Sequence, residues 1–362
     1  MKRARVAVAM SGGVDSLRAA ILLKQQGHEL IGLHMRLVSG PTGKGLGTSP
    51  RSSPEEDLYR LAGAFGIPLR IVDLVDDFEA RVIASFLSAY LDGMTPNPCV
   101  VCNPQIKFGV LLKKARQLGA EFLATGHYAR IATPGERNGR WGLRKARDPG
   151  KDQSYFLHGL TQEQLAAALF PLGDVLKSEV FRWAEEEGIR PEIPPESQEI
   201  CFIQTGSYLD FVRKRVDLSR YGDRGPIVDL DGRVLGEHKG IFAYTVGQRR
   251  GLGIASSAPY YVVDLDPASN TVTVGRAQDL YRQELRADRV NWVSRDRPSH
   301  PISCQVRIRN QHRPAAALLT PLENARVAVR FREPQRAVTP GQAAVFYDGD
   351  RLLGGGTICR TP

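Results

Sequence analysis

A hexapeptide rich in serine and glycine near the start of the chain is the first candidate for chemistry. Residues 11–16 read SGGVDS and directly follow the apolar run Val6 to Met10. Glycine takes positive φ angles and lets the backbone approach a ligand, while nearby hydroxyls and the first N–H groups of a helix bind anions. The segment therefore predicts a strand, a pyrophosphate-binding loop and a helix, with nucleotide chemistry at the loop.

The residues after the hexapeptide support this prediction. Apolar residues recur at helical spacing from Val14 to Ile21, Gly27 is placed to end the helix, and Leu30 to Met35 reads as a second strand. The alternative is a tight Ser/Gly turn without a ligand. A kinase-like or dinucleotide-binding loop is disfavoured, because the chain has no G-x-x-x-x-G-K-S/T segment and no G-x-G-x-x-G after the first strand.

Two cysteines on one short segment are the second candidate. Cys99 and Cys102 lie within residues 95–103, which read TPNPCVVCN. The prolines and asparagines predict a loop rather than a buried helical face, and Lys107 is close enough in sequence to favour a thiolate. The pair fits half of a zinc site, a redox pair or buried apolar residues, but zinc would need a second pair or suitably spaced histidines.

Cys201 is the third thiol of interest. Its apolar neighbours by themselves predict a core cysteine in a short strand. A protein that activates an oxygen with ATP and also carries accessible thiols can, however, exchange that oxygen for sulfur, because AMP is a good leaving group. The phosphate loop and the thiols together suggest sulfur transfer.

Composition sets the frame for this chemistry. The 362 residues are 42% hydrophobic without a long uncharged apolar run, which predicts a soluble chain of two or three domains at roughly 100 to 200 residues each. The N-terminus lacks a signal peptide, so a cytoplasmic location is expected. Forty-nine Lys and Arg against 39 Asp and Glu give a net charge of +10, which favours a polyanionic partner. Five cysteines are too few and too irregular for a secreted disulfide framework.

The elements needed to position these residues fall into three regions. Strands and helices alternate to about Phe202, which predicts a parallel sheet covered by helices. Short β-prone runs between Gly-rich turns follow from about Gly206, and the spacing of the later runs predicts a small barrel. The expected domains are 1–204, 205–280 and 281–362. Residues 39–53 are low in apolar content and are expected to form a mobile loop.

Motifs along nearly the whole chain resemble those of the bacterial tRNA-specific 2-thiouridylases, which belong to the PP-loop ATP pyrophosphatase family. The segments that carry the resemblance are SGGVDS, TPNPCVVCNPQIKF from Thr95, ATGHYAR from Ala124, KDQSYFL from Lys151, EICFI from Glu199, TVGQRRGLGI from Thr245 and VTPGQAAVFY from Val338. The resemblance implies an α/β fold with an N-terminal adenine nucleotide alpha-hydrolase-like domain, a small β-rich central domain and a C-terminal β-barrel. Leu17 and Arg18 stand where small residues are usual in the family.

The implied activity is ATP-dependent 2-thiolation of the wobble uridine of tRNA. The C2 oxygen is adenylated, and sulfur from a cysteine persulfide then displaces AMP, so that the products are 2-thiouridine, AMP and pyrophosphate. Mg²⁺ is the expected ion at the phosphates, with Asp15 as its candidate ligand. The expected partners are the anticodon stem-loop of tRNA and a sulfur donor such as a cysteine desulfurase or a sulfur-relay protein.

The resemblance also implies roles for individual residues. Cys102 is the nucleophile and Cys201 the persulfide carrier, and the two form a disulfide during turnover. The implied ATP-binding residues are Ala9, Met10, Ser11, Gly12, Gly13, Val14, Asp15, Ser16, Met35 and Gly126. The implied tRNA-binding residues are Asn97, Pro98 and Cys99 at the target base, together with His127, Lys151, Asp152, Gln153, Arg309, Asn310 and Gln342.

Three alternatives remain open at this point. Cys99, Cys102 and Cys201 are enough thiolates to hold an iron–sulfur cluster with one iron open to sulfide. Another PP-loop enzyme would adenylate a different substrate, but it would not need the paired thiols and a basic barrel. A non-catalytic tRNA-binding relative should have lost residues of the loop or the thiols, and these are present.

Overall fold

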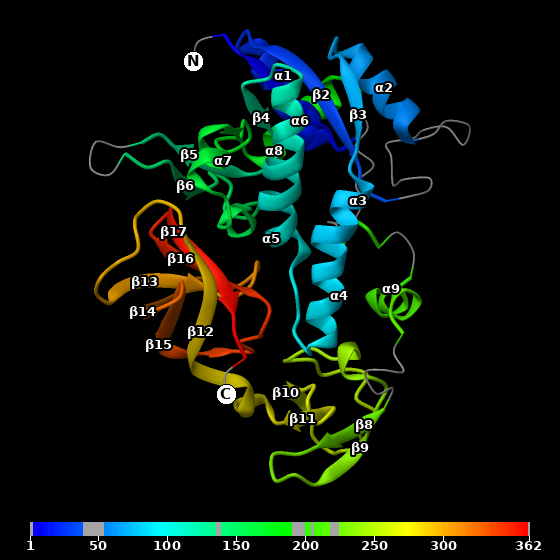
Figure 1. Ribbon diagram of the computed structural model, residues 1–362, viewed down its shortest axis with the longest axis vertical. Helices are drawn as coiled ribbons and strands as arrows, with labels where there is room; N and C mark the ends of the chain where they lie inside the picture. Colours follow the sequence, from blue (N-terminus) through cyan, green and yellow to red (C-terminus); the bar gives the residue numbers. More distant parts are fainter. Residues whose placement is uncertain are drawn as a thin grey trace.

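The computed structural model describes residues 3–38, 54–134, 139–189, 200–203, 206–217 and 224–360. The loop predicted at residues 39–53 lies outside these ranges. The chain forms a helix-covered parallel sheet, a small β domain at the opposite end and a barrel beside both (Figure 1). Among the described residues, no helix is long and apolar enough to cross a membrane.

The N-terminal sheet has five parallel strands in the order β3-β2-β1-β4-β7. Their bounds are Arg5–Ala9 for β1, Glu29–Arg36 for β2, Leu69–Asp73 for β3, Phe122–Ala124 for β4 and Ala168–Leu169 for β7. The strand order reverses between β1 and β4. Ligands of such sheets bind outside the carboxyl ends of the strands at this switch point. The SGGVDS loop, directly after β1, is therefore at the expected edge.

Both faces of the sheet are buried by helices, which explains why β1 is apolar from Val6 to Ala9. Val6 and Val8 are fully buried in a core that contains residues of α1 (Val14–Gln25), α2 (Pro54–Ala64) and α8 (Lys177–Glu186). Ala7 lies in the second core, which contains residues of α6 (Leu112–Gln117). The predicted first strand, helix and second strand are confirmed, and Gly27 follows α1 with φ +85°.

Two long helical segments lead from the sheet toward the central domain (Figure 1). The first comprises α3 (Val75–Phe78), η1 (Glu79–Ile83) and α4 (Ala84–Leu91), and the second comprises α5 (Pro98–Cys102), η2 (Asn103–Leu111) and α6. Both η1 and η2 are π-helical. This wide form of helix is rare in proteins, and where it occurs it is often found at functional sites.

The loop predicted around Cys99 and Cys102 is wrong. Asn97 caps a helix, because its Oδ1 accepts from the Cys99 N–H at 3.2 Å, and Pro98 occupies the first helical turn. Asparagine at the N-cap and proline at N1 are both favourable helix starts. The residues that suggested irregular backbone therefore begin a helix, and Cys102 is buried on it.

Shorter elements complete the N-terminal region. They are the hairpin β5 (Ala129–Ala132) and β6 (Gly142–Lys145), η3 (Ser154–Leu157), α7 (Gln162–Ala166) and α9 (Tyr208–Arg215). The hairpin was not predicted. It joins the barrel sheet, because β6 pairs with β17 and places Leu143 opposite Leu352.

The central domain contains a four-stranded sheet in the order β10-β11-β8-β9. The strands are β8 (Gly225–Val228), β9 (Val234–His238), β10 (Tyr261–Asp266) and β11 (Thr271–Gly275), accompanied by the 3₁₀ turns η5 (Ile241–Ala243) and η6 (Ala277–Leu280). Ile227, Val262 and Val272 are fully buried in its core. The predicted β-rich domain is confirmed.

The C-terminal barrel is closed by six strands in the order β12-β15-β14-β13-β16-β17, with β12 also paired to β17. Their bounds are Tyr281–Trp292, Ile302–Arg307, Ala315–Leu322, Arg326–Arg336, Ala343–Asp348 and Arg351–Ile358 for β12 to β17. Glycine is required where β17 crosses β12, since a Cβ at Gly354 would lie 2.4 Å from the Asn291 oxygen. The predicted barrel is confirmed.

Candidate active site

The SGGVDS loop has the geometry of an anion-binding turn. Gly12 adopts φ +87°, which a residue with a side chain rarely takes, and Gly13 is the N-cap of α1 without any side-chain cap. Ser16 Oγ donates to the Gly13 oxygen at 2.8 Å and accepts from the Ser11 N–H at 3.2 Å. The first N–H groups of α1 are therefore left uncapped at the carboxyl edge of the sheet, where they suit a phosphate.

Two further predicted ATP-binding residues lie on or just after the strands that pair with β1. A Cβ at Gly126, just after β4, would lie 2.9 Å from the Asp15 carbonyl carbon and the Ser16 nitrogen, so only glycine allows this approach. Met35 lies on β2 beside His34, whose Nδ1 is hydrogen-bonded to the Met10 oxygen at 2.8 Å. The structure thus places Gly126 against the loop and Met35 on the adjacent strand.

Asp15 is held by two residues that the sequence did not indicate. Lys177 Nζ lies 2.6 and 2.7 Å from the two carboxylate oxygens, and Tyr128 Oη donates to Oδ1 at 2.7 Å. Burial, and then the Asp15 charge, raise the pKa of Tyr128, so its hydroxyl stays protonated and remains a donor. Only proximity in the fold joins these residues, since Lys177 begins α8 far along the chain.

This arrangement does not fit a magnesium ion held by Asp15. Both carboxylate oxygens are already bonded to an ammonium group, and a metal there would have to displace it. Within the described ranges, no group of three or more His, Cys, Asp or Glu side chains is arranged to hold a metal ion. The same finding applies to the iron–sulfur ligands considered for Cys99, Cys102 and Cys201.

The three thiols share one electrostatic environment. Burial raises the pKa of Cys102 to about 12, Lys107 opposes that rise, and Cys201 and Cys99 add to it. Lys107 acts in the same direction on Cys99 and Cys201, whose pKa values burial also raises. All five cysteines are free; Cys102 is buried, and Cys99 and Cys201 have exposed surface. Lys107 is thus the cation that favours the thiolate form at all three.

The π-helical turn explains how Lys107 reaches these thiols. An i→i+5 hydrogen-bond pattern places residues five apart on one side of the helix, as Cys102 and Lys107 are. Gln164 Nε2 donates to the Pro104 oxygen at 2.7 Å, and a Cβ at Gly109 would lie 2.8 Å from that oxygen. The wide turn therefore depends on a side chain from α7 and on a glycine.

Cys201 lies in an exposed turn rather than in the core strand that its neighbours predict. The next residue, Phe202, is buried and contacts the rings of Phe78 and Phe86 edge-on, at centroid distances of 5.6 and 5.3 Å. The buried Phe202 side chain therefore anchors the turn, while Cys201 remains exposed to solvent. The first residue of the EICFI motif, Glu199, lies outside the described residues.

Several predicted tRNA-binding residues contact the protein itself. Asp152 is buried and accepts from Arg307 Nη1 of the barrel at 2.7 Å, and Gln153 Oε1 accepts from the Tyr128 N–H at 3.1 Å. Lys151 is half-buried beside them. Arg307 was not predicted as a functional residue. The KDQ segment therefore joins the barrel to Tyr128, which in turn is bonded to Asp15.

The remaining predicted tRNA-binding residues are buried or half-buried and bonded within the protein. His127 is buried and neutral, since burial lowers its pKa well below the ordinary value, and its Nδ1 is 2.7 Å from Thr125 Oγ1. Arg309 Nη1 donates to the Arg336 oxygen at 3.1 Å, and Asn310 Oδ1 is buried. Gln342 Nε2 donates to the Thr95 oxygen at 2.9 Å.

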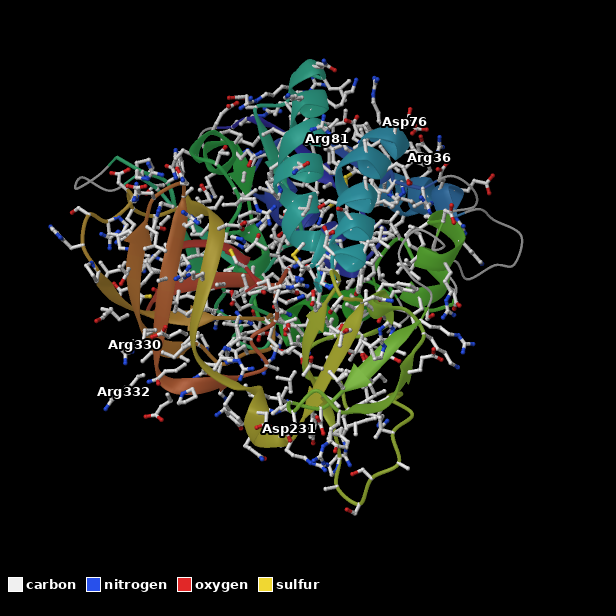
Figure 2. The ribbon with its side chains drawn as sticks, turned by 60° about the horizontal axis from the view of Figure 1, so that its bottom comes forward. Arg36, Asp76, Arg81, Asp231, Arg330 and Arg332 are labelled. Carbon is white, nitrogen blue, oxygen red and sulfur yellow. The ribbon has the colours of Figure 1, made fainter. Side chains whose placement is uncertain are left out.

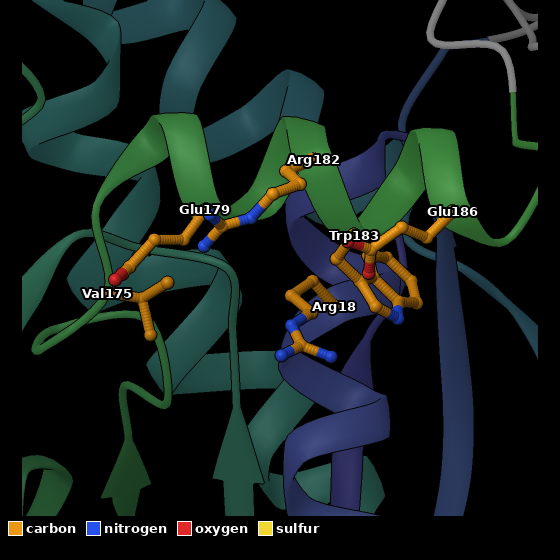
Figure 3. Close-up of a pocket in the computed structure, with 6 residues that line it drawn as sticks. All are labelled: Arg18, Val175, Glu179, Arg182, Trp183 and Glu186. Atoms are coloured by element: carbon orange, nitrogen blue, oxygen red, sulfur yellow. The ribbon is translucent and has the colours of Figure 1, made fainter.

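A pocket between α1 and α8 lies apart from the thiols (Figure 3). The Arg18 guanidinium lies over the Trp183 ring at 4.9 Å, and Arg182 and Glu186 also line the pocket. Leu17 is buried in the core that α1 forms with β1. The two residues that depart from the family pattern thus pack α1 against its neighbours.

Basic side chains also extend from the outside of the barrel. Arg330 and Arg332 project from β15 into solvent, as Figure 2 shows. They add basic groups to the exterior of the C-terminal barrel.

Comparison with known proteins agrees with this architecture along the whole chain. Three family profiles match: the tRNA methyl transferase HUP domain at residues 4–205, the tRNA methyl transferase PRC-barrel domain at 210–276 and the aminomethyltransferase beta-barrel domain at 282–358. The chain is 48% identical to the tRNA-specific 2-thiouridylase MnmA of Geotalea uraniireducens, over 99% of this chain and 95% of that protein.

Two further relatives carry the same name. The chain is 47% identical to the protein from Geobacter metallireducens, over 98% of this chain and 97% of the relative. It is 47% identical to the protein from Moorella thermoacetica, over 97% of this chain and 98% of the relative. Similarity at this level extends over all three domains, and the chain belongs to the tRNA-specific 2-thiouridylase family.

Proposed function

We propose that this protein catalyses the ATP-dependent 2-thiolation of the wobble uridine of tRNA. The proposal rests on two features that occur together in one domain. One is a PP-loop that leads into an uncapped helix N-terminus, and the other is a set of three thiols whose pKa values are all lowered by the charge of Lys107, against the effect of burial. Membership of the 2-thiouridylase family supports ATP and tRNA as the substrates. The domains would be 1–204 for catalysis, with 205–280 and 281–362 engaging tRNA, and the protein would act in the cytoplasm.

The first step is activation of the uridine. The C2 oxygen attacks the alpha phosphorus of ATP, the bond to the beta phosphate breaks, and pyrophosphate leaves. Residues 9–16, Met35 and Gly126 would bind the nucleotide, and the N–H groups at the start of α1 would stabilise the departing charge. Asp15 would position Lys177 beside the phosphates, since its carboxylate is bonded to that ammonium group.

The second step is sulfur transfer. The terminal sulfur of a persulfide on Cys201 attacks C2 and AMP leaves, so that C2 and Cys201 are joined through a disulfide. The Cys102 thiolate then attacks the Cys201 sulfur, which releases 2-thiouridine and leaves a Cys102–Cys201 disulfide. In the other order, Cys102 first releases sulfide from Cys201, and sulfide displaces AMP. Either order needs an external thiol reductant to restore both cysteines, and a desulfurase or relay protein to reload Cys201.

The tRNA contacts follow from exposure. Asn97, Pro98 and Cys99 would face the target base, and Lys151, Arg309 and the basic barrel surface would contact the backbone. His127, Asp152, Gln153, Asn310 and Gln342 lie within the protein or between its domains in this structure, so each would need to move before it touched tRNA. Extrusion of the wobble base costs about a few kcal/mol, which phosphate contacts offset.

The test is turnover with defined components. The protein is incubated with tRNA, ATP, cysteine, a cysteine desulfurase and a thiol reductant, and the wobble nucleoside is analysed by mass spectrometry. We expect 2-thiouridine from the wild-type protein and from Cys304→Ser, and none from Cys102→Ser or Cys201→Ser. Activity that survives Cys201→Ser would contradict the proposal.

A variant at Cys99 separates the relay from the iron–sulfur alternative. The relay predicts that Cys99→Ser retains most activity and that metal-free protein is active. A cluster held by all three thiols predicts that Cys99→Ser fails like the other two variants, and that activity requires anaerobic reconstitution with iron and sulfide.

A further inference from the structure

Thr95 lies at the point where the three domains meet. Its N–H donates to the Pro340 oxygen at 2.9 Å, and its carbonyl oxygen accepts from Gln342 Nε2 at 2.9 Å. Its hydroxyl donates to Thr245 Oγ1 at 3.3 Å. Pro340 and Gln342 belong to the barrel region, and Thr245 belongs to the central domain. Each polar group of this one catalytic-domain residue is therefore bonded to one of the other two domains.

The partners of Thr95 are themselves fixed. Gly341 donates to the Ile358 oxygen at 2.9 Å, and Ile358 donates to the Gln342 oxygen at 2.8 Å, so the turn is tied to the end of β17. The Thr245 N–H donates to Gln248 Oε1 at 3.1 Å. The groups that hold Thr95 are thus anchored within their own domains.

The approach of the barrel turn to Thr95 requires glycine. Gly341 adopts φ +89°, and a Cβ on it would lie 2.9 Å from the Met94 Cβ and from the Thr95 nitrogen. A second contact lies close by, where Arg360 Nη2 donates to the Asp92 oxygen at 2.9 Å. The junction is therefore a close-packed joint rather than a chance contact between surfaces.

Thr95 directly precedes the segment that would face the target base. Pro96 and Pro98 restrict the backbone on both sides of Asn97, so a displacement of Thr95 is passed on rather than absorbed. Asn97 in turn caps α5, which carries Cys99 and Cys102. The position of Thr95 therefore sets where the base-facing residues and the nucleophile begin.

We propose that Gln342 and Thr245 are positioning residues that hold the base-facing segment 96–99 through Thr95. The proposal rests on the function proposed above and adds a role for the two other domains. These domains do not touch the reacting atoms; they fix Thr95, the residue from which the base-facing segment begins. Because the Gln342 amide is bonded to the Thr95 oxygen, its substitution should change the rate of thiolation more than the affinity for tRNA.

The first experiment replaces the donor at Gln342. In Gln342→Glu the side chain keeps its shape but presents a carboxylate to the Thr95 oxygen, so the hydrogen bond is lost. We expect the thiolation rate at saturating tRNA and ATP to fall about tenfold, the effect of one lost buried hydrogen bond with an acceptor left unpaired. The dissociation constant for tRNA should change less than about twofold.

A parallel pair tests the central domain. Thr245→Val removes the hydroxyl and should slow thiolation in the same way, whereas Thr245→Ser keeps it and should behave as wild type. Gln305→Glu on the exposed face of β13 and Thr273→Val on β11 make the same chemical changes away from the joint. Both control variants should retain the wild-type rate.

Hydrogen exchange supplies a readout that does not depend on activity. The amides of Thr95, Cys99 and Val100 should exchange faster in Gln342→Glu than in wild type or Gln305→Glu, because the joint that orders them is weakened. Unchanged rate and exchange in Gln342→Glu would overturn the inference, as would a loss of tRNA affinity with an unchanged rate. A wild-type protein that does not thiolate tRNA would overturn the proposed function, while exchange would still test the joint.

Discussion

At the scale of single residues, the proposed nucleotide chemistry rests on the contacts of Asp15. The SGGVDS motif identified Asp15, but not the ammonium group and hydroxyl that hold it. Lys177 and Tyr128 come from α8 and from the turn after β4, and they meet Asp15 only because the parallel sheet brings those elements to one edge. No spacing in the sequence signals such a meeting, whereas the loop itself is local and was predicted.

The first prediction concerns this cluster. Asp15→Ala should abolish formation of AMP and 2-thiouridine, because Lys177 loses the carboxylate that positions it. Binding of tRNA should stay within a few fold, since the basic surface is elsewhere. Breaking a fully buried ion pair lowers the free energy of unfolding by about 3 to 5 kcal/mol. We expect a smaller loss in Asp15→Ala, because Asp15 is partly exposed. Product analysis, tRNA binding and urea unfolding measure these effects, and thiolation retained by Asp15→Ala would contradict the assignment.

The second prediction separates the thiols by reactivity. Burial raises the pKa of Cys304 in the barrel core to about 12, from an ordinary value of 9.0. Iodoacetamide near neutral pH should therefore label Cys99 and Cys201 in the native protein well before Cys304. Mass spectrometry of the digested protein gives the order, and labelling of Cys304 as fast as Cys201 would contradict the structure.

The same pKa sets the direction of a pH effect on stability. The folded protein keeps the Cys304 proton between about pH 9 and 12, whereas the unfolded chain releases it. The contribution of this thiol is therefore fully present below pH 9 and is lost as the pH rises toward 12. The difference in unfolding free energy between wild type and Cys304→Ser should fall over that interval and remain constant below it.

At the scale of elements, the helix at Pro98–Cys102 shows where local patterns mislead. Asparagine and proline favour turns, but they also favour the first positions of a helix. The local sequence around Asn97 and Pro98 therefore does not decide between a turn and a helix. The outcome depends on packing of the following residues, including the fully buried Ile106 and Leu111, against the rest of the domain. The β5–β6 hairpin was missed for a related reason, since its pairing partner is the distant strand β17.

The third prediction concerns the approach of β4 to the loop. A methyl group at Gly126 would lie 2.9 Å from backbone atoms of Asp15 and Ser16, so Gly126→Ala should displace the loop and weaken ATP binding. Gly63→Ala is the matched control, because nothing lies within 4 Å of a Cβ at that position on α2. It should leave ATP affinity unchanged and raise stability by about 0.5 to 1 kcal/mol. Equal ATP affinity in both variants would refute the close approach.

At the scale of the whole molecule, sequence reasoning predicted the three regions and their order, because each has its own periodicity and composition. It did not predict how they dock. Buried polar contacts such as Arg307 with Asp152 and Gln342 with Thr95 join residues more than a hundred positions apart. Residues that resemble tRNA contacts in sequence therefore hold the domains together in this structure.

The fourth prediction follows from the net charge of +10. If several phosphates of the anticodon stem-loop contact the basic surface, the logarithm of affinity should fall linearly with the logarithm of salt concentration, by roughly 0.7 to 0.9 per contact. Arg332→Gln on the barrel exterior should reduce that slope if it is one of these contacts, without altering the rate of the chemical step. Affinity that does not depend on salt would argue against tRNA as the partner.

A single-turnover measurement tests the central claim, that ATP and a Cys201 persulfide together convert uridine to 2-thiouridine. Protein loaded with labelled sulfur on Cys201 is freed from the donor and mixed with tRNA and ATP without reductant. We expect labelled 2-thiouridine, AMP and a Cys102–Cys201 disulfide in equal amounts, and no transfer when ATP is omitted. Labelled 2-thiouridine formed without ATP, or without the disulfide, would contradict it.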